Sequence, residues 1–361
     1  MRGIVEKYLR VIECGVIDPL KSQAIYHGLA SSLSNECQPI LVISQPSQPY
    51  VCIGLHQDLD EIDVSYCQKN NLPIIRRHVG GGTVYLDQHQ LFFHFVFPQK
   101  KAPNRIADLY PFFIRPVIET YQAFGIKAYL KLPNDIQVNG RKLGGTGAAT
   151  IENATVMVGS FLYDFDYQTM GDCLNVPSAE FRQTFIELLR EHMTTIQQSI
   201  RPVPTYQQLT AIFLQNIQQH CQLSIQPSQL MSREYEQISM AENELASPEW
   251  LFQPGRRLIP NGVKIASHTY LLEINLPSMG DEMRMLLLQK DGKVGGCQLV
   301  NQVGLRVYSD VFERLSGVAL TECALHKHFM RLSTGNVNDV HGLMNPQIIR
   351  DILSGICRID L

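Results

Sequence analysis

The chain has 361 residues, of which 45% are hydrophobic and 18% charged, and its formal net charge is −3 at pH 7. This length exceeds the usual size of one domain and predicts a large domain with a smaller one. The small net charge, with no basic run carrying interleaved aromatic residues, argues against nucleic acid as a partner. No stretch approaches the twenty apolar residues of a membrane helix, so we expect no membrane partner.

The first residues and the cysteines indicate a compartment. Residues 1–19 contain Glu6 and Glu13 and no continuous apolar core, which is unlike a signal peptide, so we expect a cytoplasmic protein. Nine cysteines are scattered along the chain and never spaced as C-x-x-C, which argues against a disulfide framework and a cysteine zinc site. We expect most of them to be small buried apolar residues in a reducing compartment.

Helices and strands alternate in the first part of the chain. Asp18 can cap a helix that has Pro19 at its first position and runs to Leu33. Strands are predicted over 39–44, 50–54 and 72–77, with a helical piece over 60–70. The run 91–97 is apolar with little alternation, which predicts a strand buried on both faces and makes His94 a core histidine.

The remaining elements follow in chain order. Helices are predicted over 109–124, 179–192 and 206–220, and strands over 126–132, 135–138 and 156–162, with a hairpin turn at Asn139-Gly140. Residues 227–245 are polar and predicted to be at most locally helical. Three prolines and two glycines make 247–262 the best candidate linker. A compact module is predicted beyond it, with strands over 269–276, 284–289 and 298–300 and helices over 311–315 and 346–353.

The first motif with chemical meaning is a glycine run that follows two arginines. It consists of Arg76, Arg77, His78, Val79, Gly80, Gly81, Gly82, Thr83 and Val84. Such glycines predict a loop that approaches a ligand closely and presents backbone N–H groups, with fixed positive charge beside it. We expect a phosphate or carboxylate to bind there. A plain turn with solvated arginines stays the alternative, because the run matches neither a P-loop nor G-x-G-x-x-G.

A second motif surrounds the predicted hairpin, K-L-P-N-D-I-Q-V-N-G-R-K-L-G-G-T-G over 131–147. The hairpin brings Asp135 and Lys142 onto neighbouring strands, where carboxylate and ammonium hold each other. Such a lysine can touch a substrate carboxyl oxygen and a nucleotide α-phosphate, and so offset the charge that develops in acyl adenylation. Asn134 would lie near the phosphates, and Asp135 could hold Mg²⁺. The alternative is an exposed hairpin with an ordinary surface ion pair.

These motifs, with residues 53–57 and the helix at Asp18-Pro19, resemble the lipoate-protein ligase A family of the biotin ligase, lipoate ligase and octanoyltransferase superfamily. The similarity spans most of residues 11–220. It implies an α+β fold with a class II synthetase-like mixed β-sheet flanked by helices, and a small α/β accessory C-terminal domain. The expected organisation is a catalytic acyl-adenylate or acyltransferase domain over 1–246, a linker over 247–262 and the accessory domain over 263–361. Residues 247–252 resemble the W-x-F segment that joins the two domains in such ligases.

The resemblance also implies a reaction and its residues. Lipoate would be activated with ATP and Mg²⁺ to lipoyl-AMP, and the lipoyl group would pass to a lysine of a lipoyl carrier protein, either a lipoyl domain or a glycine-cleavage H-like protein. Lipoate would lie in an apolar tunnel floored by residues 91–97, and Asp87 or Asp135 would accept the proton of the carrier lysine. We expect a monomer. The implied catalytic residues are Lys142, Asp135 and Asn134, the binding residues are Arg76, Arg77, Gly80, Gly81, Gly82, Val84, Gly145 and Thr146, and the metal ligand is Asp135.

Departures from the family pattern leave alternatives open. Leu86 and Val158 stand where many relatives have histidine, so the acyl chain, the acceptor and the rate stay open. Leu55 stands where relatives have arginine, which leaves one cation fewer for phosphate. An octanoyltransferase or lipoyl amidotransferase would instead form a thioester on a cysteine. One branch of these enzymes has that cysteine where this chain has Leu130. The other branch has it near Cys173, which is out of register with the expected position. A biotin ligase shares K-x-P-N-D but has a G-R-G-R loop that this chain lacks. A binding module without turnover is the remaining alternative.

Overall fold

The computed structural model describes residues 7–103, 105–132, 134–257, 259, 261–266, 268–280, 282–300, 314–333 and 346–356. Contacts divide the chain into two compact units, which we call the larger unit (Met1–Leu174 and Arg190–Arg256) and the smaller unit (Asn175–Leu189 and Arg257–Leu361). Most of helix α5 (Ala179–His192) therefore groups with the smaller unit. The domain boundaries expected from the sequence stay a prediction.

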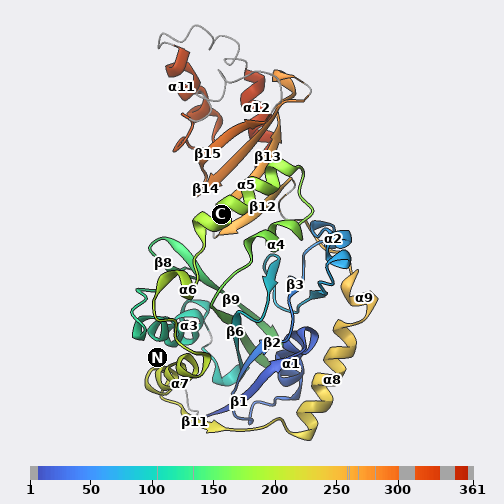
Figure 1. The fold of residues 1–361 in the computed structure, drawn as a ribbon, viewed down its shortest axis with the longest axis vertical. Helices are drawn as coiled ribbons and strands as arrows, with labels where there is room; N and C mark the ends of the chain where they lie inside the picture. Colours follow the sequence, from blue (N-terminus) through green and yellow to red (C-terminus); the bar gives the residue numbers. More distant parts are fainter. Residues whose placement is uncertain are drawn as a thin grey trace. The chain divides into compact units, whose positions relative to one another are not determined.

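The larger unit is built on an eight-stranded mixed sheet with the order β11-β1-β2-β6-β10-β9-β8-β7 (Figure 1). Pairing is parallel from β11 through β1 to β2 and antiparallel from β2 onward. The strands of this sheet are β1 (Tyr8–Ile17), β2 (Ile40–Pro46), β6 (Gln90–Pro98), β7 (Tyr129–Lys131), β8 (Asp135–Val138), β9 (Arg141–Ile151), β10 (Ala154–Leu162) and β11 (Ser224–Pro227). A three-stranded sheet, β4-β3-β5, contains β3 (Tyr50–Ile53), β4 (Ile74–Arg76) and β5 (Val84–Leu86).

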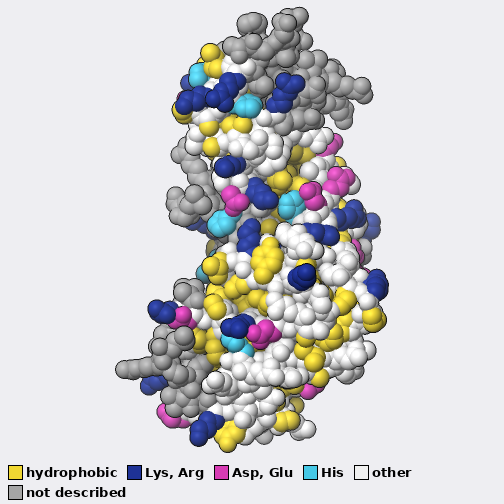
Figure 2. Space-filling view, turned by 90° about the vertical axis from the view of Figure 1, so that its left-hand side faces the viewer, with side chains coloured by type: hydrophobic (Ala, Val, Ile, Leu, Met, Phe, Trp, Pro, Cys, Tyr) yellow, Lys and Arg dark blue, Asp and Glu magenta, His cyan; other side chains and the backbone are white. Residues whose placement is uncertain are grey.

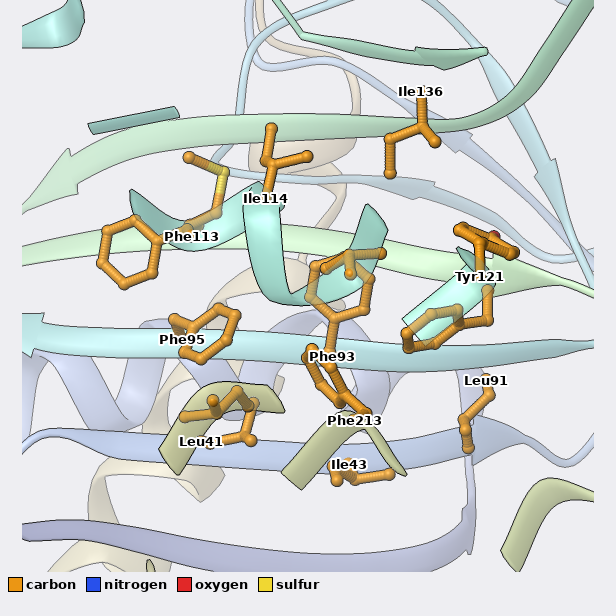
Figure 3. Packing of buried hydrophobic residues seen from close by; sticks show 14 of the residues in the cluster. Leu41, Ile43, Leu91, Phe93, Phe95, Phe113, Ile114, Tyr121, Ile136 and Phe213 are labelled. Atoms are coloured by element: carbon orange, nitrogen blue, oxygen red, sulfur yellow. The ribbon is translucent and has the colours of Figure 1, made fainter. Parts of the chain in front are cut away.

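Helices cover both faces of the large sheet, as predicted for this fold class. The helical segments of the larger unit are α1 (Pro19–Ser32), η1 (Leu59–Glu61), α2 (Val64–Lys69), η2 (Gln99–Lys101), α3 (Ile106–Ala123), α4 (Tyr167–Asp172), α6 (Ile196–Ser199), α7 (Tyr206–Cys221), α8 (Ser232–Leu245) and α9 (Pro248–Leu251). Helices α3 and α7 cover one face, where Phe113 and Phe213 pack against Phe93 and Phe95 of β6 (Figure 3). Helices α1 and α8 cover the other face.

Several local predictions are confirmed. The side chain of Asp18 caps α1 by accepting a hydrogen bond from the Leu20 N–H at 2.8 Å, and Pro19 occupies the first turn. Every residue of β6 is buried, including His94, because its two faces pack against different helix layers. Among the described residues, no helix is both long and apolar enough to cross a bilayer.

The prediction for 227–245 was wrong, because this segment contains the 14-residue helix α8. Its buried positions, Glu234, Ile238, Ala241 and Leu245, follow helical spacing, but only three of them are apolar. The helix packs closely on α1, where a Cβ atom at Gly28 would lie 2.5 Å from the Ile238 Cα. Tertiary packing against α1 thus stabilises a helix that the polar composition obscured.

The smaller unit contains an antiparallel sheet with the order β12-β13-β14-β15. Its other elements include η3 (Pro277–Met279), α11 (Glu322–Ser333) and α12 (Pro346–Gly355), and its strands are β12 (Gly262–Ala266), β13 (Thr269–Asn275), β14 (Arg284–Lys290) and β15 (Lys293–Val300). Leu272, Leu287 and Ile352 belong to its hydrophobic core. The predicted strands and the helix over 346–353 are confirmed, α11 was not predicted, and the helix expected over 311–315 falls mostly outside the described residues.

Figure 2 shows basic and acidic side chains interspersed over one face of the molecule, with hydrophobic side chains gathered between them. This mixture on that face accords with the small net charge of −3.

Candidate active site

The glycine run forms a loop between β4 and β5 whose conformation depends on glycine. Gly81 has a φ of +100°, a value that residues with a side chain rarely adopt. Gly54, at the end of β3, lies directly beneath it, since a Cβ atom there would come within 2.0 Å of the Gly81 carbonyl oxygen. Gly80, Gly81 and Gly82 are all exposed. The loop therefore lies against β3 and leaves its outer side open.

The second arginine holds this loop by its carbonyl oxygens. The Arg77 guanidinium donates hydrogen bonds to the carbonyl oxygens of Gly80 at 2.9 Å, Gly82 at 2.8 Å and Cys52 at 3.0 Å. In the described part of the chain, no protein acceptor takes a hydrogen bond from the N–H groups of residues 80–82. These N–H groups can therefore serve an anionic ligand, in the way that loops of successive backbone donors do.

The first arginine lies beneath the loop and is fully buried. Its guanidinium donates to the carbonyl oxygens of Gln57 at 2.6 Å, Leu55 at 3.1 Å and Leu251 at 2.9 Å. Arg76 thus joins the turn after β3 to the segment after α8. In this structure its donors face backbone oxygens, so Arg76 supports the loop from below.

The hairpin of β8 and β9 carries the acid–base pair that the sequence predicted. Its turn is formed by Asn139 and Gly140, both with positive φ, as expected for an Asn-Gly hairpin. The Lys142 Nζ lies 2.8 Å from the Asp135 Oδ1. The Asp135 side chain is 4% exposed, whereas that of Lys142 is 26% exposed. The buried carboxylate therefore fixes an ammonium group that solvent and ligands can still reach.

Glycine also makes room for this ammonium group. A Cβ atom at Gly145 would lie 3.2 Å from the Lys142 Nζ and 3.3 Å from its Cε. The lysine side chain thus bends back over Gly145 on its own strand. The absence of a side chain at this position sets where the positive charge rests.

Asn134 and Thr146 close the same hairpin at its open end. The Asn134 Nδ2 donates to the Thr146 carbonyl oxygen at 2.8 Å, and the Thr146 Oγ1 donates to the Asn134 carbonyl oxygen at 3.0 Å. Pro133, before them, lies outside the described residues. The four polar residues predicted for this motif are therefore held together on one pair of strands.

The glycine loop and the hairpin meet through Val79. This residue is buried, and a Cβ atom at Gly147 would lie 2.7 Å from the Val79 Cγ1. Since Gly147 follows Thr146 on β9, the loop lies directly against the strand that carries Lys142. Val158 on β10 packs in the same apolar cluster. The two motifs, which are some fifty residues apart in sequence, therefore form one region of the larger unit.

The residues that follow the glycine loop, and strand β6, differ in how far they are buried. Val84 is an exposed apolar residue at the start of β5, and Leu86 packs on the cluster around Tyr50 and Phe92. Asp87 is buried, which raises the pKa of its carboxyl group, and its Oδ1 accepts a hydrogen bond from the His89 N–H at 2.9 Å. The side chains of β6 are packed on both faces, so the apolar tunnel stays a prediction.

Two supports of the loop were missed by the sequence analysis. The Gln57 side chain accepts from the Gly54 N–H at 2.9 Å and donates to the Thr83 Oγ1 at 3.1 Å, which ties the ends of the loop region together. The Trp250 Nε1 donates to the Arg76 carbonyl oxygen at 2.8 Å. Only the single tryptophan in an otherwise linker-like segment hinted at this contact.

The cysteine considered for a thioester mechanism is inaccessible. Cys173 is 0% exposed, and its Sγ donates to the Met170 carbonyl oxygen at 3.2 Å. Leu130, at the other position considered, lies on β7 and offers no nucleophile. A thiol that forms an acyl thioester has to be reached by its substrate.

The larger unit has the fold of a lipoate protein ligase. It resembles the solved structure of a bi-partite lipoate protein ligase and its E2 lipoyl domain from Thermoplasma acidophilum, with a TM-score of 0.63 and 20% identity over 70% of this chain and 99% of that one. The chain belongs to the lipoyl protein ligase A/B catalytic-domain family, whose model matches residues 18–218. Family membership and the α+β fold with a mixed sheet flanked by helices are thereby confirmed.

Two curated relatives represent different reactions. Lipoate–protein ligase 1 of Staphylococcus aureus is 24% identical over 243 residues, which cover 67% of this chain and 71% of that protein. Octanoyltransferase LipM of Bacillus subtilis is 21% identical over 271 residues, which cover 68% of this chain and 98% of that protein. The protein is therefore an enzyme of the lipoate ligase and octanoyltransferase family, and the choice between the two reactions depends on the site.

Proposed function

We propose that this protein is a lipoate–protein ligase, which activates lipoate with ATP to lipoyl-AMP and transfers the lipoyl group to a lysine of a carrier protein. The observation that carries the proposal is the Lys142 ammonium, fixed 2.8 Å from buried Asp135 on a strand that adjoins the glycine loop. The site thus combines a positioned cation with unused backbone donors, which suits a reaction between two anions. We place this reaction in the cytoplasm and in a monomer.

The site residues have distinct roles in the first step. The N–H groups of residues 80–82 bind phosphate oxygens, while the Lys142 ammonium faces both the lipoate carboxylate and the α-phosphate. As a carboxylate oxygen attacks the α-phosphorus, pyrophosphate leaves and the mixed anhydride forms. Lys142 offsets the negative charge that builds up on the phosphorus oxygens. Asn134 and Thr146 keep the hairpin closed so that the lysine stays in place.

In the second step a carrier lysine, as the neutral amine, attacks the acyl carbonyl, the bond to AMP breaks, and the proton that the nitrogen loses passes to solvent. The carrier is a lipoyl domain or a glycine-cleavage H-like protein. When bound with ATP, Mg²⁺ would neutralise part of the phosphate charge. The magnesium role expected of Asp135 does not fit its surroundings, since the carboxylate is buried and paired with Lys142. The proposal therefore assigns Asp135 to the positioning of Lys142.

Lipoate-dependent exchange between ATP and pyrophosphate tests the proposal. We expect exchange with lipoate, no exchange with biotin, and a lipoyl mass increase on a carrier protein in the presence of ATP. Absence of both exchange and transfer would leave a binding module without turnover and refute the proposal.

Octanoyltransferase activity is the second candidate, because LipM is matched over 98% of its length. The buried state of Cys173 and the leucine at position 130 speak against it. Incubation with an octanoylated carrier in the absence of ATP separates the two reactions. ATP-independent acyl transfer that is lost in Cys173→Ala would favour the transferase and overturn the ligase.

A further inference from the structure

Three side chains from separate elements of the larger unit bring metal-binding atoms together behind the glycine loop. His27 lies on α1, His78 lies between Arg77 and the loop glycines, and Glu244 lies on α8. The His27 Nδ1 and the His78 Nε2 each lie 3.8 Å from the Glu244 Oε2. All three ligand atoms lie within 4.8 Å of one another.

The two imidazoles have nitrogen atoms that the protein leaves unsatisfied. Both the His27 Nδ1 and the His78 Nε2 are buried and have no hydrogen-bond partner. Buried polar atoms of this kind carry a free-energy cost unless something else binds them. The side chains of His27 and His78 are 13% and 14% exposed, whereas Glu244 is 45% exposed. A cation that reaches this place from the solvent side would satisfy both nitrogen atoms and the carboxylate.

We propose that His27, His78 and Glu244 bind one divalent transition-metal ion of the zinc type, with a fourth coordination position open to water. Two imidazole nitrogens and one carboxylate oxygen favour Zn²⁺ over Mg²⁺ or Ca²⁺, which prefer oxygen ligands. Tetrahedral zinc with metal–nitrogen bonds of 2.0–2.1 Å places its ligand atoms roughly 3.3 Å apart. The two 3.8 Å separations close to that value by small rotations of the exposed Glu244 side chain. The His27 and His78 rings, whose centroids lie 3.6 Å apart, must also turn to bring their nitrogen atoms to that spacing from a separation within 4.8 Å.

This site goes beyond the proposed reaction, since none of its residues belongs to the Lys142 hairpin. An ion bound there links α1 and α8 to His78, which precedes Val79 and the loop glycines. The His78 ring also stacks on Trp250, with ring centroids 4.2 Å apart, and Trp250 in turn donates to the Arg76 carbonyl oxygen. The metal therefore braces the glycine loop from behind, together with the tryptophan and the arginine beneath it.

The single tryptophan provides a direct probe of the site. Paramagnetic Co²⁺ is titrated into the metal-free full-length protein without ATP or lipoate, and Trp250 fluorescence is recorded. We expect saturable quenching with one ion per chain, absorption bands of tetrahedral Co²⁺, and recovery of fluorescence when Zn²⁺ displaces Co²⁺. Zn²⁺ should also raise the Tm of the protein.

Glu244→Gln is the central variant, because the exposed side chain can change without affecting packing. It should weaken metal binding by at least ~10–100-fold, because mutation of a residue that merely hydrogen-bonds to a metal ligand already causes such a loss. Glu236→Gln, at an exposed position of the same helix, removes the same charge and should bind as the native protein does. His78→Ala and His27→Ala should lose binding while circular dichroism shows them folded.

Two results would overturn the proposal. One is the absence of Co²⁺ or Zn²⁺ binding to the native protein. The other is binding that persists unchanged in Glu244→Gln and in the His27→Ala/His78→Ala double variant, which would assign the ion to other groups such as the cysteines. Because binding is measured without substrates, neither result depends on whether the protein is a ligase.

Discussion

Lys142 and Asp135 form an ion pair of 2.8 Å in which only the lysine is accessible. The asymmetry matters because the buried carboxylate restricts where the lysine sits, while the exposed ammonium remains available to substrate oxygens. The bulged hairpin register places Lys142 opposite Gln137 and Asp135 opposite Gly145, so the lysine reaches the acid by bending along its own strand.

Lys142→Ala should reduce lipoate-dependent ATP–pyrophosphate exchange by about 10²–10³-fold, the loss that removal of one transition-state donor causes. Exchange and carrier lipoylation measured by mass spectrometry check this. Lys127→Ala, at an exposed position, should retain native activity. Near-normal lipoyl transfer by Lys142→Ala would contradict the assigned role.

Gly145→Ala should lower exchange by about 10- to 100-fold without unfolding the protein, since it displaces the ammonium group rather than removing it. The added Cβ would lie 3.2 Å from the Nζ, at the flexible end of the lysine, so the side chain can move by a few tenths of an ångström. Gly296→Ala on β15 is the control, because a Cβ atom there meets nothing within 4 Å. Equal exchange rates for both variants would show that the position of Lys142 tolerates this shift.

Arg76→Met should destabilise the larger unit by about 3 kcal/mol or more, because several buried carbonyl oxygens lose their donor. The buried guanidinium serves Gln57, Leu55 and Leu251, so the loss affects two segments at once. Urea unfolding followed by Trp250 fluorescence measures the free energy of unfolding. Arg105→Met is the control, since that side chain is 75% exposed; a similar effect of both variants would refute the role of Arg76.

The parts of the fold that the sequence predicted are those with local causes. The helix capped by Asp18, the two-sided burial of residues 91–97 and the turn at Asn139-Gly140 each follow from neighbouring residues, and so does the pairing of Asp135 with Lys142 across seven positions. Helix α8 was missed because its stability comes from packing on α1.

The supports of the glycine loop could not be predicted for the same reason. Arg76 bonds to a carbonyl oxygen 175 residues away, and a linker-like composition gives no indication of that contact. His27, His78 and Glu244 are likewise brought together only by the packing of α1 and α8. Sequence motifs thus named Arg76, whereas the distant backbone groups that it holds were visible only in the fold.

His94 should make the larger unit less stable as the pH falls from 7 to 5. Burial lowers its pKa from the ordinary value of 6.5 to about 3. In the unfolded chain the imidazole binds a proton near pH 6.5, but in the folded protein it does so only near pH 3. Stability is therefore fully present above pH 6.5 and is lost as the pH falls below it, by about 2 kcal/mol between pH 7 and 5.

His94→Leu isolates this contribution, because leucine fills a similar volume and carries no proton. Other titrating groups contribute equally to both proteins. Between pH 7 and pH 5 the free energy of unfolding of the native protein should therefore fall by about 2 kcal/mol relative to that of the variant. Urea unfolding at several pH values measures this difference, and the absolute stability of the variant does not affect it. A difference independent of pH would mean that His94 takes up its proton in the folded protein as readily as in the unfolded chain, and that its burial is relieved by local opening of β6.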